Sequence, residues 1–139
     1  MAIERYGPLS LAELKTLIDG LGWFAASDDS SSKYTWYADE EEQKPVLQID
    51  YSLTAPEVKF SHNGSMSQST TDYIQSSIPA GSSFYAFKTK NGLLISTKTE
   101  FVESYWYQWA AMICKTDSGA VAMAMQTSQS VPNTVSISA

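Results

Sequence analysis

The residues best suited to recognition chemistry are four large aromatic side chains within five positions, namely Tyr105, Trp106, Tyr107 and Trp109. Consecutive rings on a strand face both sides of a sheet, so one set fills the core. The other set then needs a second layer, a subunit neighbour or a ligand. Because exposed rings stack on sugars and are enriched at interfaces, three interpretations stay open: ordinary core, a partner interface and a sugar platform.

Groups that could carry catalysis are few. His62 is the only histidine, and its alternation with Val58 and Phe60 indicates the end of a strand rather than part of a catalytic triad. Cys114 lies among apolar residues, so we expect it to pack as a small hydrophobe. On a strand, its neighbour Lys115 would point to the opposite face and could not lower the pKa of the thiol.

Paired carboxylates are the remaining catalytic possibility. Asp50 and Glu57 could meet across two neighbouring strands and share acid and base roles, although the spacing does not require it. We therefore expect no catalytic residue and no enzyme.

The sequence also predicts no metal and no cofactor. Acidic residues gather at Asp28–Asp29 and Asp39–Glu42, where loop oxygens could hold calcium, but no twelve-residue calcium loop is present. Solvated surface charge is the ordinary interpretation of both groups. A single cysteine excludes an internal disulfide and a cysteine-based zinc site. Glycine-rich phosphate loops, dinucleotide fingerprints and metal-protease helices are also missing.

Length and composition narrow the class of protein. A chain of 139 residues with 43% hydrophobic residues suits one β-rich domain spanning 1–139. The formal charge of −6 and the scattered basic residues argue against nucleic-acid binding. No apolar run approaches the ~20 residues of a membrane span. The N-terminus lacks a basic region followed by an apolar stretch, so we expect no signal peptide and synthesis in a cytoplasm.

The chain is organised around its longest apolar region, from Phe101 to Met125. We expect two adjacent strands there, joined by the polar turn Lys115–Gly119. From Ala120 to Met125 small and large residues alternate and both faces are apolar, which predicts a strand covered on both sides. The first half, Phe101–Ile113, also fits a helical stripe; its aromatic density and the turn after it favour a strand.

The clearest helix signal lies near the N-terminus. Ser10 and Glu13 form a capping-box pattern, and apolar residues follow at helical spacing until Gly20 or Gly22. A helix this short must pack its leucine-rich face on another element, and a sheet is the expected partner.

The rest of the chain predicts short strands. Asn91-Gly92 is the strongest hairpin signal, and 27–32 is expected to be a polar loop. The other expected strands cover residues 22–26, 34–37, 46–51, 58–62, 73–78, 84–90, 93–98 and 134–138. The sequence therefore predicts an α+β domain with one N-terminal helix packed on a mostly antiparallel β-sheet of roughly seven to nine strands, folded as a sandwich or partial barrel.

Two segments resemble small structural proteins of tailed bacteriophages and prophages, in which strands end in Thr-Lys-Thr-x-x-Gly-like turns. They are Phe87–Ser96 and Met112–Val121, and the resemblance covers the last 55 residues or so. The second segment departs from the pattern, because it reads Cys-Lys-Thr-Asp-Ser-Gly. The resemblance transfers no functional residue. It implies a non-enzymatic, tail-associated virion protein that is made in the host cytoplasm and then enters the virion.

The expected function is that of a structural or interaction protein. It would form a homo-oligomer, or bind other virion proteins, through an apolar sheet face, with the four clustered aromatic residues at the contact. The alternative is a carbohydrate-binding module for host-surface recognition, in which the same rings stack on a glycan.

Overall fold

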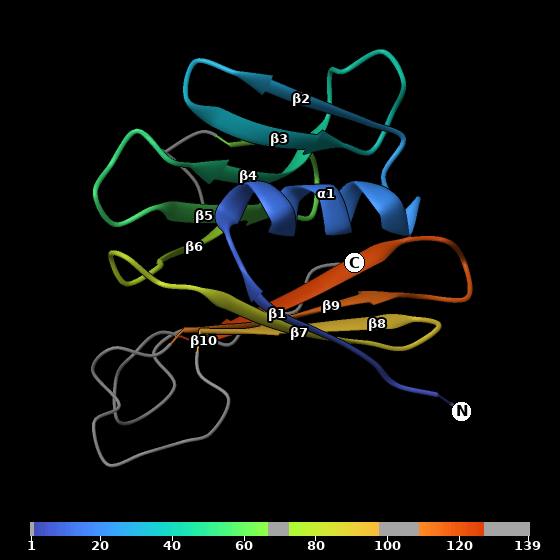
Figure 1. Ribbon diagram of the computed structural model, residues 1–139. Coiled ribbons are helices and arrows are strands. Elements are labelled where there is room, and N and C mark those ends of the chain that lie inside the picture. The colour runs from blue at the N-terminus through green and yellow to red at the C-terminus, as the bar shows by residue number, and fades with distance from the viewer. Residues whose placement is uncertain (1, 67–72, 98–108, 127–139) are drawn as a thin grey trace.

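The structure is a computed structural model that describes residues 2–66, 73–97 and 109–126. Two five-stranded antiparallel sheets stack on one another, and the single helix lies between them (Figure 1). Sheet A has the strand order β1-β7-β8-β9-β10, and sheet B has the order β2-β3-β4-β5-β6. In chain order the elements are β1 (Glu4–Leu9), α1 (Leu11–Leu21), β2 (Ala26–Ser30), β3 (Lys33–Tyr37), β4 (Pro45–Asp50), β5 (Glu57–Ser61), β6 (Tyr73–Ser77), β7 (Phe84–Lys88), β8 (Gly92–Ser96), β9 (Ala110–Lys115) and β10 (Val121–Gln126). This arrangement confirms the predicted α+β sandwich.

Helix α1 begins and ends where the sequence predicts. The Glu13 amide donates to Ser10 Oγ at 3.1 Å, and the Ser10 amide donates to the Glu13 carboxylate at 3.0 Å. This reciprocal capping box satisfies two amides that have no partner within the helix. Gly22 ends the helix in the left-handed conformation, with φ of 70°. Leu14 and Ile18 are buried, so the helix contributes its apolar face to the core between the sheets.

The core is built from the inward-facing residues of both sheets. Strand side chains alternate between faces, and every second residue of β4, β5, β8 and β9 is buried. The cluster joins sheet B to sheet A through the helix. Its largest fully buried members are Trp36, Phe60, Phe84, Leu14, Ile18, Leu47, Ile78, Leu93, Ile95, Ile113, Met123 and Met125.

Two predictions about residues 22–32 are wrong. The expected strand at 22–26 is a connection, and the expected loop at 27–32 holds β2 and a tight turn. Ser31 and Ser32 both have positive φ, of 53° and 61°. A two-residue hairpin turn of type I′ requires positive φ at both of its central residues. β2 is an edge strand made of small and acidic residues, so hydrophobic alternation does not reveal it.

Strand β1 was also not expected. It pairs with β7 at the edge of sheet A, and its residues are mostly exposed, with a register shift between Tyr6 and Leu9. With β1 and β2 the described residues hold ten strands rather than seven to nine. Both missed strands lie at sheet edges, where one row of backbone groups is unpaired and the side chains need not be apolar.

The hairpin at the end of the organising region is confirmed. β9 and β10 pair antiparallel from Lys115–Val121 to Ala110–Gln126. Met123 and Met125 are buried on the inner face. Ala122 and Ala124 lie on the outer face, buried and half-buried respectively, so both faces of the strand are apolar. For the segment Phe101–Ile113, where strand and helix were both considered, the structure shows a strand from Ala110 onward. Residues 101–108, and the edge strand expected at 134–138, lie outside the described residues.

Helix α1 has 11 residues. Among the described residues no helix is both long and apolar enough to cross a membrane.

Candidate functional site

The outer face of sheet A is apolar across four strands. Phe87 pairs with Leu94, Leu94 with Met112, and Met112 with Ala124, so these four side chains form one row across the sheet. Met112 is 39% exposed, and the other three are half-buried. We define the apolar outer face as Tyr85, Phe87, Leu94, Ala110, Met112, Cys114, Ala122 and Ala124.

The outer face of sheet B has the opposite character. Glu57 forms an ion pair with Lys59 at 3.8 Å and accepts a hydrogen bond from Gln75 at 2.8 Å. Gln48 donates to Thr35 at 3.3 Å on the neighbouring strands. A sheet face that carries charges and amides is built to meet water. The two outer faces of the same sandwich therefore differ, and the apolar one is the stronger candidate for recognition.

Of the four aromatic residues predicted to make contacts, the structure describes one. Trp109 is 2% exposed and packs edge-on against Phe84, with ring centroids 6.4 Å apart and planes at 89°. Its backbone is held at the end of β8, because the Trp109 amide donates to Thr97 Oγ1 at 2.8 Å. Trp109 is thus a core residue and offers no ring to a partner. Tyr105, Trp106 and Tyr107 lie outside the described residues.

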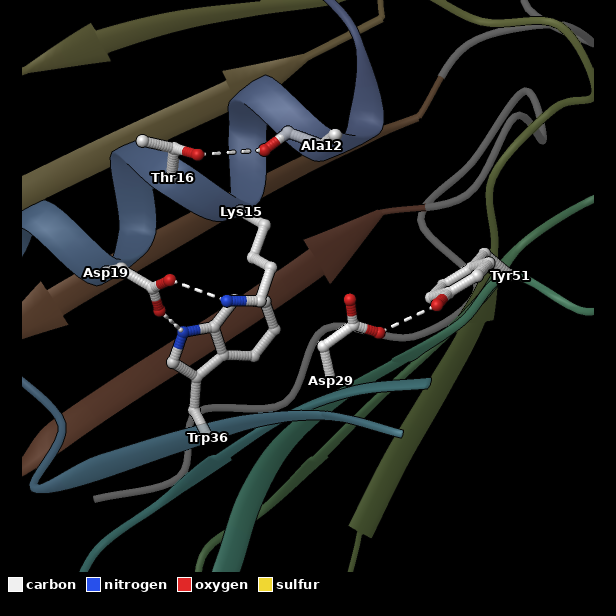
Figure 2. A network of polar contacts seen from close by, with 7 residues as sticks. All are labelled: Ala12, Lys15, Thr16, Asp19, Asp29, Trp36 and Tyr51. Carbon is white, nitrogen blue, oxygen red and sulfur yellow. Dashed lines mark hydrogen bonds and ion pairs between the residues drawn. The ribbon is translucent and has the colours of Figure 1, made fainter. Parts of the chain in front are cut away.

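A polar network joins α1 to sheet B (Figure 2). Lys15 and Trp36 point toward the same carboxylate: Lys15 Nζ lies 2.6 Å from Asp19 Oδ2, and Trp36 Nε1 donates to Asp19 Oδ1 at 2.8 Å. Partial burial alone would raise the pKa of Asp19. The hydrogen bonds from Lys15, Trp36 and Ser27, with the lysine charge, outweigh burial and hold the pKa below its usual value.

The same region holds a second polar pair. Tyr51 donates to Asp29 Oδ1 at 2.7 Å, and this hydrogen bond raises the pKa of Tyr51 to about 12. Tyr34 lies between the two pairs: its ring is 4.6 Å from that of Tyr51, and the Lys15 ammonium is 5.6 Å from its centroid. A tyrosine that keeps its proton and a lysine already paired are poor nucleophiles. The network therefore fixes the helix to the sheet.

The catalytic candidates from the sequence are not brought together. Cys114 lies on the apolar outer face beside Ala122, while His62 is an exposed residue directly after β5. Asp50 and Glu57 do face each other in register across β4 and β5. Asp50, however, accepts from the hydroxyl and the amide of Ser52, and these bonds hold its pKa below the usual value. A general acid would need a raised pKa instead.

Asp28 and Asp39, one from each acidic group, accept hydrogen bonds from donors of the chain itself. Asp28 accepts from Ser30 and from the Tyr37 hydroxyl. Asp39 accepts from the amides of Gln43 and Lys44 and thereby closes the charged connection between β3 and β4. Within the described ranges, no three His, Cys, Asp or Glu side chains gather as metal ligands would.

The apolar outer face was only partly foreseen in the sequence. Alternation of small and large residues in Ala120–Met125 predicts a strand with two apolar faces, and the structure places Ala122 and Ala124 on the outer one. The contribution of Phe87 and Leu94 could not be assigned, because it depends on which strands are neighbours. Their own local signal is an apolar residue at an outward position of a short strand.

Comparisons with known proteins give no relative from which a role could be transferred. No family model matches the chain, and no curated protein or solved structure is significantly similar to it. Its function has to be inferred from its own residues.

Proposed function

We propose that this protein is a non-enzymatic structural protein that associates with further copies of itself through the apolar outer face of sheet A. The single observation that supports this most is the row Phe87–Leu94–Met112–Ala124, which crosses four strands without a charged residue. Large apolar patches on protein surfaces commonly mark interaction sites.

Charge decides which outer face a second copy would use. The chain carries a formal charge of −6, so two copies repel each other at long range. Contact through the outer face of sheet B would bring equal sets of charges together. Contact through the apolar outer face avoids this, and Arg5 on β1, opposite Phe87, is left at its border. Like protomers can therefore meet there without burying an unpaired charge.

The wider role follows from the resemblance of the C-terminal segments to phage and prophage structural proteins. The proposal is that the assembly is a tail-associated part of a virion, built after synthesis in the host cytoplasm. Contact of the same face on both copies gives a two-fold dimer, so a ring would need a further, head-to-tail contact between such dimers.

The test is the solution mass, by size-exclusion chromatography with light scattering. We expect an oligomer, and three, six or more protomers would support the virion role. Met112→Lys should reduce the mass to that of one protomer, since it places an unpaired charge in the interface. The matched control is Gln75→Lys, which makes the same change in net charge on the outer face of sheet B and should leave the mass unchanged. Gln75 contacts Glu57 and pairs with Lys59 across the strands, so the new lysine meets one neighbour of each charge.

A parent protein that is monomeric at high concentration would overturn self-association. So would an oligomer that Met112→Lys and Gln75→Lys affect equally. The carbohydrate-binding alternative gains no support from the described residues, because Trp109 is buried. With a monomeric parent, a glycan screen read by tryptophan fluorescence would be the next experiment.

A further inference from the structure

A cavity of about 260 Å³ opens at one end of the sandwich. It lies where α1 ends and the β9–β10 turn projects, on the right in Figure 1. Five parts of the described chain form its walls: the α1–β2 connection, the β3–β4 connection, the start of β4, the end of β5, and the turn that leads into β10. The cavity therefore spans the gap between the two sheets, a usual place for a small-molecule site.

The wall is divided about evenly between apolar and polar surface. Trp23 and Phe24 are half-buried rings that follow the helix, and Phe60 and Val121 come from the two sheets. The ring of Phe24 packs against that of the buried Trp36, with the ring centroids 6.3 Å apart. An aromatic molecule can pack on these apolar side chains while a polar atom at its edge meets the polar part of the wall.

Among the described residues that line the cavity, Ser61 and His62 are the polar ones. Ser61 Oγ donates to the Asn63 side chain at 2.9 Å and accepts from the amide of Ser65 at 3.0 Å, so its hydroxyl is occupied. His62 is the only ionisable side chain of these described lining residues. A charged ligand would lack a counter-ion there, whereas one hydrogen-bonding atom could be met by the imidazole.

We propose that this cavity binds a small, uncharged aromatic molecule of one or two fused rings, with one hydrogen-bonding atom directed at His62. The size follows from the volume, because a dry cavity of roughly 150 Å³ holds a benzene ring. The site is independent of the proposed assembly, since none of its lining residues belongs to the apolar outer face.

The experiment uses indole and indene as probes, which have nearly the same shape but differ in the N–H group. Amide and indole N–H resonances of the full chain are followed by nuclear magnetic resonance during titration. We expect saturable shifts at residues 119–121 and at the Trp23 indole. Indole should bind about three- to tenfold more tightly than indene, the contribution of one uncharged hydrogen bond. His62→Ala should abolish that preference.

A variant that fills the space completes the test. Ala120→Leu should remove the saturable shifts, and Ala38→Leu, in the β3–β4 connection, is a second filling variant if the first folds poorly. Ala12→Leu, an exposed helix position, is the matched control and should bind indole as the parent does. Met112→Lys should also bind indole as the parent does, because Met112 lies on the apolar outer face and not in the cavity. Absence of saturable shifts, or equal binding by Ala120→Leu, would overturn the proposal, and a preference for indole that survives His62→Ala would overturn the role of the imidazole.

Discussion

Met112 and Ile113 are neighbours on β9 that point to opposite sides of sheet A, and their replacement by alanine tests which side is core. Ile113 is 0% exposed and belongs to the core cluster, whereas Met112 is 39% exposed on the apolar outer face. We expect Ile113→Ala to destabilise the protomer strongly and Met112→Ala to do so only weakly.

The magnitude follows from the carbon atoms removed. Ile113→Ala deletes three buried carbons, which cost about 0.8 kcal/mol each in lost burial. The cavity left behind adds to this, so the total should fall within the ~2–5 kcal/mol found for such replacements. Met112→Ala removes a side chain that a lone protomer leaves partly in water, and its effect should stay below about 1 kcal/mol.

Measurements at two protein concentrations distinguish the stability of the protomer from the stability that association adds. Association adds stability by mass action, so the cost of Met112→Ala should grow as the protein is concentrated, while that of Ile113→Ala should change little. Urea unfolding followed by tryptophan fluorescence at a low and a high concentration measures both effects. If Met112→Ala cost as much as Ile113→Ala in the dilute sample, the outer face would be packed within one protomer, and the proposed interface would fail.

Two further predictions concern α1. Ser10→Ala removes the acceptor of the Glu13 amide and should cost about 1 kcal/mol in urea unfolding, whereas Ser10→Asp should restore most of it. Asp19 has a folded pKa below its usual 3.8, so its ionised form stabilises the fold. That contribution is complete above pH 3.8 and is lost as the pH falls through the lower folded value. Asp19→Asn should therefore flatten the acid side of the stability profile; an unchanged profile would show that the carboxylate does not hold the helix to Trp36.

Features that depend on neighbours in the sequence could be predicted well. The capping box of Ser10 and Glu13 and the glycine after Leu21 fix α1 within the chain. Asn91-Gly92 marks the β7–β8 hairpin, but not its turn: Gly92 begins β8, and the connection spans residues 89–91 instead of the expected two-residue loop. Such signals act over a few residues, so they survive whatever the rest of the molecule does.

Features that depend on pairing between distant parts of the chain could not be predicted from the sequence. β1 forms because Glu4–Leu9 pairs with β7, some eighty residues further along the chain, and its own residues are mostly exposed and lack an apolar alternation. The division of ten strands into two sheets has the same origin. Trp109 shows that the role of a single residue is also hard to predict from sequence. Four clustered rings suggest recognition, but only the packing of Trp109 against Phe84 shows that this ring belongs to the core.

The character of the two sheets explains why one outer face can associate and the other resists it. On sheet B, Glu57 and Lys59 are paired with each other and with their neighbours, so a partner would have to strip water from charges that are already satisfied. On sheet A the row through Met112 offers no such groups, and removing water from it is favourable. The acidic edge strand β2 works in the same direction, because Asp28 and Asp29 discourage a further strand from pairing there. If copies associate as proposed, both differences favour sheet A as the contact face.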